Sequence, residues 1–426
     1  MHYIRLLRPG KIQSSTEGLT ISLLFTITTD LGDSFLCPED DSIDIVVAAV
    51  DPAASPAHSA SVLPRGKQAC KYKWKAGMRV LDAKVKLRSG LKRETVNCRF
   101  AIYPAQQRLR DTPSPLGALY VGDVLPWRVD TYETLKMGII MPATFEFING
   151  TCAPVSVRTL ALGAGHFIND DGGDSMLNLH FEEDIGESIA RHIWDAGVVT
   201  SAYLADACSS LEIIRELFPI ERGRFNVLEL GSGVGILGIT IASILPRVAA
   251  AQGQTLKDAK VLLTDLEEAE ERARSNIARS KTTLGLNSVG DANVATEYEN
   301  LDWDEGCEGR FGPLAAATSW DLVVLSDCTY NVDSLPSLVG TLSALHAAKE
   351  QRRGADIDTV ESSVLLATKP RHSSEQALFR LLKDQSWMYR VVKEIPLPKI
   401  GEEDEVVQIY LLERGGHVVL NSLQRS

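Results

Sequence analysis

The first 170 or so residues read as short strands separated by loops rich in turn-forming residues. Runs of β-branched and aromatic residues carry this pattern: LTISLLFTI (19–27), IDIVVAAV (43–50), RVLDAKVKL (79–87), TVNCRFAIY (95–103) and ATFEFI (143–148). Such runs are typical of β-strands, and no helical period is apparent before about Ile185. We therefore expect a β-rich N-terminal domain over residues 1–172. The alternative is an extension whose strands join the sheet of the second half.

From residue 173 onward, the pattern changes to an alternation of helices and strands. A helical period begins near Ile185, and continuous apolar strands follow, separated by helices: NVLEL (226–230), KVLLTDL (260–266), WDLVVLSD (320–327) and SSVLLATKPR (362–371). Such an alternation predicts a mostly parallel sheet covered by helices on both faces. The last runs, MYRVVKEI (388–395) and VVQIYLLER (406–414), have no helix between them. They predict a terminal hairpin and one antiparallel strand in a domain over residues 173–426.

Composition narrows the class of protein. With 426 residues the chain is too long for one ordinary core, which favours two domains. A formal net charge of -12 argues against a general nucleic-acid binder. The seven cysteines include no C-x-x-C pair, so we expect no metal site, and their spacing suits reduced thiols.

Location follows from what the sequence does not contain. MHYIRLLRPGK at the N-terminus is too short and too polar for a signal peptide, and no 18-residue apolar run occurs. We expect a monomer in the cytoplasm, with the nucleus as an alternative, that binds neither membrane nor nucleic acid.

The stretch LELGSGVGILG (228–238) joins a predicted strand to a predicted helix and admits two interpretations. Gly233, Gly235 and Gly238 fit the G-x-G-x-x-G pattern of dinucleotide-binding enzymes. Glu229 followed by the glycines at 231 and 233 instead indicates a nucleoside cofactor without phosphates. A carboxylate at the strand end repels a pyrophosphate but can hold an ammonium.

The acid of the next strand supports the second interpretation. Asp265 ends that strand and can accept hydrogen bonds from both ribose hydroxyls, but it lies further along than the roughly 20 residues typical of a dinucleotide site. The antiparallel terminal strand also favours the second interpretation. S-adenosylmethionine is therefore favoured over NAD, and an NAD-dependent oxidoreductase is kept as an alternative.

Several motifs together resemble the family-16 seven-β-strand protein-lysine methyltransferases over about residues 177–414. They are IWDAG (193–197), LELGSGVGILG, LLTDL (262–266), LDW (301–303), SDCTY (326–330) and TKPRHSSEQALFRLL (368–382). The long N-terminal extension resembles the larger fungal elongation-factor lysine methyltransferases. The resemblance implies a Rossmann-like, seven-stranded class I methyltransferase sheet, S-adenosylmethionine as cofactor, and a protein substrate such as a translation elongation factor or a chaperone.

The resemblance also implies roles for the matching residues. Trp194 would lie against the methionine half of the cofactor, Asp265 would bind its ribose and Trp303 its adenine. The backbone from Gly231 through Ser232 to Gly233 would line the carboxylate and the sugar, and Ser326 would close the site, while Glu229 is a further candidate for cofactor binding. The sequence departs from the family at Val234, Asp304, Cys328 and Thr329, and none of these changes removes an expected contact.

Asp327 and Tyr330 are the candidate catalytic residues. They follow a strand end at spacing i, i+3, so that one turn can direct both side chains towards the cleft. A free lysine is mostly protonated at neutral pH. An acid and a phenol can guide its ammonium and accept a proton directly or through water. The structural alternative is that Asp327 caps the following helix and Tyr330 fills a gap.

The sequence therefore predicts a protein-lysine N-methyltransferase whose N-terminal domain recognises the substrate. Two alternatives stay open, namely a small-molecule N-methyltransferase and an interaction protein that binds the cofactor without catalysis.

Overall fold

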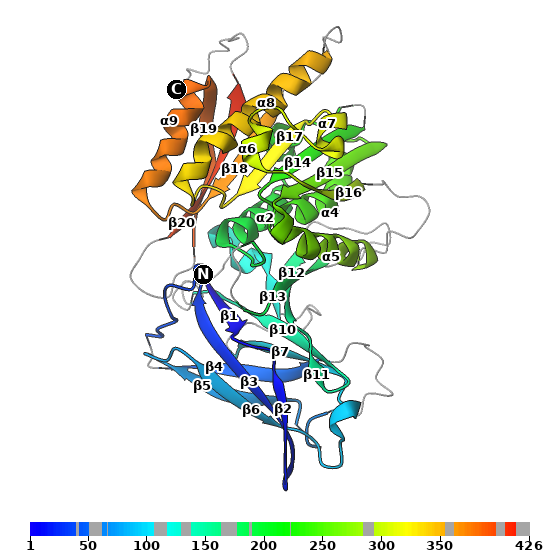
Figure 1. The fold of residues 1–426 in the computed structure, drawn as a ribbon, viewed down its shortest axis with the longest axis vertical. Helices are drawn as coiled ribbons and strands as arrows, with labels where there is room; N and C mark the ends of the chain where they lie inside the picture. Colours follow the sequence, from blue (N-terminus) through cyan, green and yellow to red (C-terminus); the bar gives the residue numbers. More distant parts are fainter. Residues whose placement is uncertain are drawn as a thin grey trace.

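The structure is a computed structural model of the whole chain (Figure 1). It describes all residues except 40–41, 51–61, 66, 106–116, 129–137, 163–176, 187–189, 222, 284–293, 354–361, 398–404 and 415–426. A β-rich N-terminal part and a C-terminal part with helices on both faces of a sheet follow one another along the long axis. Among the helices of the described ranges, none has the length and apolar composition needed to cross a membrane.

Two sheets form a sandwich in the N-terminal part. The smaller sheet has the order β2-β3-β1-β9, with β6 paired to β3, and the larger has the order β13-β12-β10-β7-β4-β5, with β11 on β10 and β8 on β12. The strands of the smaller sheet are β1 (His2–Leu6), β2 (Lys11–Ser15), β3 (Gly18–Thr29), β6 (Leu81–Lys86) and β9 (Ile140–Met141). Those of the larger are β4 (Ser42–Val50), β5 (Ala69–Lys75), β7 (Cys98–Pro104), β8 (Ala118–Tyr120), β10 (Ala143–Ile148), β11 (Thr151–Cys152), β12 (Val155–Leu162) and β13 (Leu177–Asp184).

The core of the sandwich follows from the two-residue period of its strands. Alternate residues of β3, such as Ile21, Leu23 and Phe25, are fully buried and join one cluster with Trp74 of β5 and Phe100 of β7. Successive side chains of a strand point to opposite faces, so each run buries one face. The N-terminal half therefore has a core of its own, as the β-rich domain interpretation predicts.

The C-terminal part has a seven-stranded sheet with the order β16-β15-β14-β17-β18-β20-β19. The first five strands of this order are parallel, and β20 is antiparallel to both β18 and β19. This arrangement confirms the predicted Rossmann-like class I methyltransferase sheet with its terminal hairpin. The strands are β14 (Arg224–Leu230), β15 (Asp258–Asp265), β16 (Val294–Asn300), β17 (Leu322–Ser326), β18 (Ser363–Thr368), β19 (Trp387–Pro396) and β20 (Val406–Arg414).

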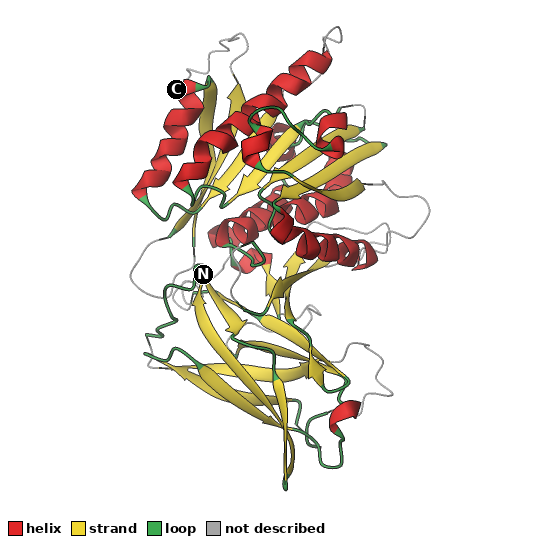
Figure 2. Cartoon of the chain, viewed as in Figure 1, coloured by secondary structure: helices red, strands yellow, loops and turns green. Residues whose placement is uncertain are grey.

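Helices cover both faces of this sheet (Figure 2). Val227 of β14 belongs to the core shared with α2 and α4, whereas its neighbour Leu228 belongs to the core shared with α8 and α9. Strands buried on both faces explain why these runs are apolar without alternation. The helices are α2 (Asp195–Ala207), α3 (Leu211–Leu217), α4 (Ile236–Ala251), α5 (Glu267–Thr283), α6 (Trp303–Gly306), α7 (Pro313–Ala317), α8 (Leu335–Arg353) and α9 (Ala377–Asp384).

One helix boundary predicted from the sequence is wrong. The helical period near Ile185 predicts a helix from there, but α2 begins at Asp195. The described residues directly before it, 190–194, are not helical. Side-chain contacts hold them: Arg191 pairs with Asp184 at 3.0 Å, and the His192 ring contacts the Gly186 carbonyl at 2.9 Å. These contacts outweigh the local helical pattern.

The strand β13 connects the two parts of the chain. It lies beyond residue 172 yet pairs with β12 along its whole length. Glu183 accepts a hydrogen bond at 2.7 Å from the Nε of Arg158, whose side chain is fully buried in the sandwich. Glu182 points the other way, towards α5, where it accepts bonds from Ser275 at 2.7 Å and Arg272 at 2.9 Å. The predicted domain boundary at 172/173 therefore stays a proposal, because β13 makes contacts in both parts of the chain.

We predict that Glu182→Ala lowers the free energy of unfolding by about 3–5 kcal/mol, the range for removing one partner of a buried ion pair. Glu182 also pairs with Arg279, so its loss leaves two guanidinium groups with fewer partners. Urea denaturation of the full chain measures the effect. Glu271→Ala is the matched control, because this side chain is 71% exposed although it contacts Arg272, and it should change stability by less than about 0.5 kcal/mol. Equal effects of both substitutions would contradict the prediction.

Candidate functional site

A glycine turn joins β14 to α4 at the carboxyl edge of the sheet. Gly231 and Gly233 have φ angles of 63° and 52°, a conformation that glycine adopts without strain. A Cβ on Gly231 would lie 2.5 Å from the Sγ of Cys328. Glycine is therefore required here both by the backbone conformation and by the close approach of the turn after β17.

Asp265 at the end of β15 holds this turn in place. Its Oδ2 accepts a hydrogen bond from the Gly233 N–H at 2.7 Å, and its Oδ1 accepts one from the Leu266 N–H at 2.7 Å. Burial raises the pKa of Asp265, and the two N–H donors oppose that shift. The carboxylate lines the cavity described below and has further acceptor capacity towards it.

Glu229 has a different position from the other predicted site residues. It is 1% exposed, and its Oε2 accepts a hydrogen bond from the Gly238 N–H at 3.0 Å in the first turn of α4. Burial, with a smaller contribution from Asp265, raises the pKa of Glu229 to about 8. The Glu229 side chain therefore stabilises the start of α4 after the glycine turn, and it does not line the cavity.

A cavity of about 380 Å³ opens beside this turn, a size within the usual range of small-molecule sites. All the predicted site residues other than Glu229 line it: Trp194, Gly231, Ser232, Gly233, Asp265, Trp303, Ser326, Asp327 and Tyr330. They come from four different strand ends and from the start of α2, as expected for a ligand site at the carboxyl edge of an open α/β sheet.

Asp327 occupies a constrained position directly after β17. Its φ angle is 54°, which is unusual for a residue other than glycine. Its carboxylate accepts hydrogen bonds from the N–H of Ala196 at 2.7 Å and of Lys369 at 3.3 Å. Burial raises the pKa of Asp327 to about 6, and the nearby Arg371 limits that rise. Asp327 thus caps the first turn of α2, which is not the following helix that the structural alternative invoked.

Tyr330 lies at the outer end of the same turn. Its side chain lines the cavity and is 58% exposed. Asp327 and Tyr330 therefore border one cavity, one at its buried wall and one at its surface.

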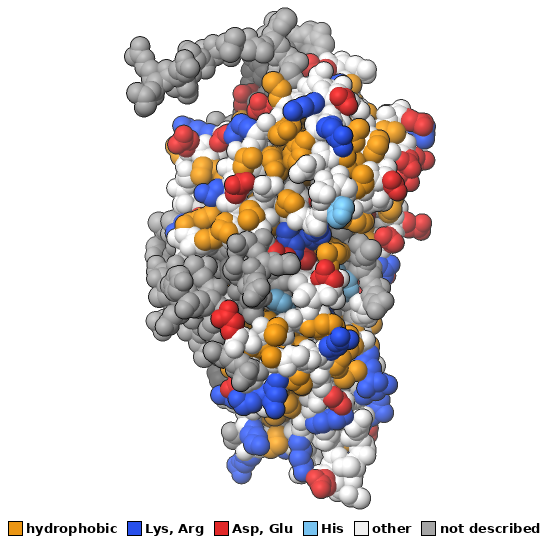
Figure 3. Space-filling model, turned by 90° about the vertical axis from the view of Figure 1, so that its left-hand side faces the viewer, with side chains coloured by type: hydrophobic (Ala, Val, Ile, Leu, Met, Phe, Trp, Pro, Cys, Tyr) orange, Lys and Arg blue, Asp and Glu red, His pale blue; other side chains and the backbone are white. Residues whose placement is uncertain are grey.

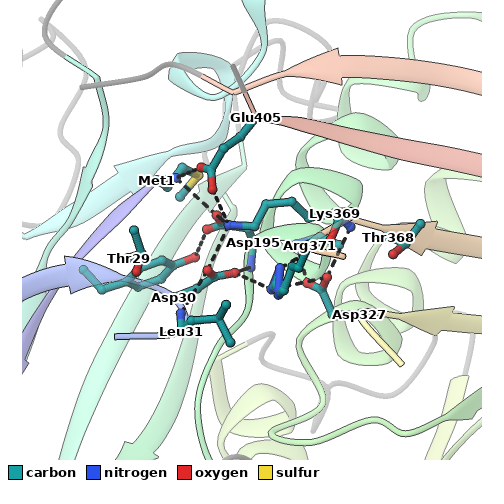
Figure 4. Close-up of polar contacts among 12 residues, drawn as sticks. Met1, Thr29, Asp30, Leu31, Asp195, Asp327, Thr368, Lys369, Arg371 and Glu405 are labelled. Atoms are coloured by element: carbon teal, nitrogen blue, oxygen red, sulfur yellow. Dashed lines mark hydrogen bonds and ion pairs between the residues drawn. The ribbon is translucent and has the colours of Figure 1, made fainter. Parts of the chain in front are cut away.

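Sequence reasoning missed a group of charged residues behind Asp327 (Figure 4). Lys369 donates to Asp30 at 2.9 Å and to Asp195 at 2.8 Å, and Arg371 donates to Asp30 at 2.7 Å. Lys369 and Arg371 fall within TKPR, a motif that carries the family resemblance, but no local pattern assigns them to the site. Asp30 ends an apolar strand run far away in the sequence, so no spacing signal connects it with them.

The residues of the cavity fit a nucleoside cofactor that carries an ammonium and a carboxylate. The buried Ser232 Oγ has no hydrogen-bond partner among the described residues, although buried polar atoms are normally paired. The open glycine turn and the Asp265 carboxylate lie on the same wall. A ligand with hydroxyls and a polar head group would satisfy these atoms.

Comparisons with known proteins match this chain to lysine methyltransferases. Residues 174–385 match the model of a family described as lysine methyltransferase. A UPF0665 family protein of Schizosaccharomyces pombe is 30% identical over 236 residues, 55% of this chain and 56% of that protein. The protein-lysine N-methyltransferase EFM6 of Saccharomyces cerevisiae is 26% identical over 218 residues, 50% of this chain and 77% of that protein.

A third relative is the protein N-lysine methyltransferase METTL21A of Danio rerio, 26% identical over 197 residues, 46% of this chain and 68% of that protein. The chain spans little more than half the length of the S. pombe relative. The family match begins at residue 174, so the β sandwich up to β12 lies outside it.

We predict that Glu229→Gln makes the chain more stable than the parent at pH 8 but not at pH 5. The raised pKa means that folded Glu229 keeps a proton between about pH 4.3 and 8, where the unfolded chain has lost it, so the stability of the parent falls as pH rises through that window. Because glutamine does not titrate, the free energy of unfolding of the variant should exceed that of the parent at pH 8 by an amount on the order of 1–3 kcal/mol. Thermal unfolding at both pH values, with the exposed Glu267→Gln as control, measures it. A parent and variant with parallel pH profiles would refute the assignment.

Proposed function

We propose that this chain, whose residues 174–385 match the model of the lysine methyltransferase family, transfers a methyl group from S-adenosylmethionine to a lysine side chain of a protein substrate. One observation carries the proposal: a single cavity joins the glycine turn, the acid of β15 and the turn from Asp327 to Tyr330. The first two features suit the cofactor, and the third suits an amine.

The proposed cofactor contacts follow from the polar atoms on the cavity wall. Asp265 accepts the ribose hydroxyls, since its carboxylate retains acceptor capacity beyond its two backbone donors. Ser232 and the backbone of the glycine turn meet the amino-acid end, and Trp194 packs beside it. Trp303 and Ser326 flank the base and the sugar. When bound, the cofactor supplies an electrophilic methyl group on sulfur.

Asp327 and Tyr330 handle the amine in this proposal. The carboxylate of Asp327 is mostly ionised at pH 7, because its pKa lies near 6. It attracts the ammonium of the incoming lysine and accepts its proton directly or through water, which frees the nitrogen lone pair. Tyr330 orients the side chain at the mouth of the cavity, and alignment of the two reacting groups supplies much of the acceleration.

A protein is the favoured substrate because of where the cavity ends. Tyr330 is largely exposed at the rim, so a substrate that stays outside and inserts one side chain covers it. A small-molecule amine, the alternative substrate, would leave this rim open to water. By resemblance to the larger fungal enzymes, a translation elongation factor is the first candidate and a chaperone the second.

The N-terminal sandwich contributes to substrate recognition in this proposal. The exposed side chains of β5 include Lys71, Lys73 and Lys75, and those of β6 include Lys84 and Lys86. Figure 3 shows Lys and Arg gathered over the lower part of the molecule, where the sandwich lies. The chain as a whole is acidic, so this basic surface is a local feature that suits an acidic region of a partner protein.

We expect label from radioactive S-adenosylmethionine to enter one or a few protein bands when the full chain is added to a cell extract. Acid hydrolysis of those bands should release methylated lysine. Asp327→Asn is the matched control and should leave the bands unlabelled over the same time. Label in small molecules alone would favour the small-molecule alternative. Cofactor binding without any label would favour the non-catalytic one.

A second test follows from the pKa of Asp327. In this mechanism the bound ammonium gives its proton to the Asp327 carboxylate, so log(kcat/KM) should change little between about pH 6 and the lysine pKa of about 10.4. Below about pH 6 Asp327 becomes protonated, so log(kcat/KM) should fall there by about one unit per pH unit. Asp327→Asn should lower the rate by about 10²–10⁴-fold and react only with the free amine, which gives a slope of about one throughout.

The measurement is a pH–rate profile with the labelled target, together with cofactor affinity by calorimetry. Affinity should change little in the Asn variant, which keeps an acceptor for the Ala196 N–H. A bend near pH 6 that persists in Asp327→Asn would assign the titration to another group. Parallel loss of affinity and rate would make Asp327 a structural cap.

A further inference from the structure

The segment after β3 brings the N-terminal part to the wall of the cavity. β3 ends at Thr29, and the next two residues, Asp30 and Leu31, reach the C-terminal part (Figure 4). Leu31 lines the cavity although its strand belongs to the sandwich. Asp30 lies beside it, and its side chain is fully buried.

The carboxylate of Asp30 is held by donors from three segments. Its Oδ1 accepts hydrogen bonds from the Nζ of Lys369 at 2.9 Å and from the N–H of Leu31 at 3.0 Å. Its Oδ2 accepts bonds from the Nη2 of Arg371 at 2.7 Å and from the N–H of Asp195 at 3.2 Å. A buried carboxylate with this many donors has one favourable orientation. It therefore holds Arg371 in place and shares the ammonium of Lys369 with Asp195 and Glu405.

Arg371 is the residue at which this cluster meets the candidate catalytic group. Its Nη2 lies 3.5 Å from Oδ1 of Asp327, and its guanidinium lies over the ring of Trp194, 5.5 Å from the centroid. Arg371 therefore contacts one acid from each part of the chain. Because the guanidinium is a planar fork with fixed donor directions, the bond to Asp30 sets its position beside Asp327.

We propose that Asp30 is a positioning residue of the candidate active site, which acts through Arg371 to hold Asp327 and Trp194 in the arrangement needed for methyl transfer. The inference rests on the proposed function and extends it. It gives the N-terminal sandwich a part in the chemical step besides any role in recognising the substrate.

A direct effect of the charge of Asp30 does not explain this arrangement. The charged and titratable groups that face Asp327 are Arg371, Asp30, Asp195 and Cys328, and the Lys369 backbone N–H also donates to it. Asp30 and Asp195 repel the negative charge of Asp327, whereas Arg371 stabilises it. Asp30 therefore supports an ionised Asp327 by holding the guanidinium in place.

The test compares the full chain with Asp30→Asn, Arg371→Gln and the double variant. Methyl transfer to the labelled target is measured at saturating cofactor, and affinity for S-adenosylhomocysteine is measured by calorimetry. Each single variant should lower kcat by about 10- to 100-fold, the effect of a displacement near 1 Å in an active site. The dissociation constant for S-adenosylhomocysteine should stay within about threefold of the parent value. The kcat of the double variant should lie within about twofold of that of Arg371→Gln, because both substitutions act through the same contact.

Asp33→Asn is the matched control, since Asp33 is exposed and lies three residues from Asp30. It should retain the kcat of the parent. Multiplicative losses in the double variant would overturn the proposal, as would a parallel fall of kcat and affinity. Where Asp30→Asn does not fold, Arg371→Lys replaces it, because the lysine keeps the charge beside Asp30 but loses the fork. An unchanged kcat in Arg371→Lys would overturn the proposal.

Hydrogen exchange separates a failure of this inference from a failure of the proposed function. The amides of Ala196 and Lys369 both donate to Asp327. Without Asp30 or Arg371 to hold it, peptides that contain these amides should exchange about tenfold faster or more, whereas Asp33→Asn leaves them unchanged. A parent chain that methylates no protein disproves the proposed function alone. Unchanged exchange in Asp30→Asn and in Arg371→Gln disproves the positioning role whatever the activity.

Discussion

The buried ion cluster at the junction of the two parts is the constraint on which the site depends. Asp30, Asp195 and Lys369 have side chains no more than 5% exposed. Burial alone would lower the pKa of Lys369, yet Asp195 and Asp30 raise it. Isolated charges in such places cost several kcal/mol each, so they are stable only as a set. The start of α2 and the segment after β18 therefore keep their geometry only while the sandwich is docked.

The same dependence appears at β13 and in the hydrophobic core. Glu183 compensates the buried Arg158 inside the sandwich, and Glu182 binds arginines of α5. One apolar cluster includes Tyr3 and Leu160 from the sandwich with Val198 of α2. A chain that begins after residue 172 would keep β13 but lose β12, which leaves Glu183 without Arg158. Substitution of exposed lysines on β5 is therefore a cleaner test of substrate recognition than truncation.

The sequence predicts the part of the fold that local periodicity determines. The buried parallel strands, the glycine turn and the acids at strand ends are visible because each depends on neighbours a few residues away. The start of α2, the short strands β8, β9 and β11, and the position of Glu229 depend on tertiary contacts instead. Asp30 and Arg371 lie 341 positions apart, and neither stands in a pattern that points to the other. Their pairing follows only from how the sandwich docks.

Two buried acids near the cavity show how docking of the sandwich affects the pKa of a carboxyl group. Glu229 accepts one backbone N–H and forms no ion pair within the described part of the chain. Burial raises its pKa to about 8, so it keeps its proton at neutral pH. Asp327 is also buried, but it accepts two N–H bonds and lies beside Arg371, so its pKa rises only to about 6. A base must be ionised to accept a proton, so of these two acids Asp327 is the one suited to that role. The difference comes partly from a guanidinium that the N-terminal sandwich holds in place.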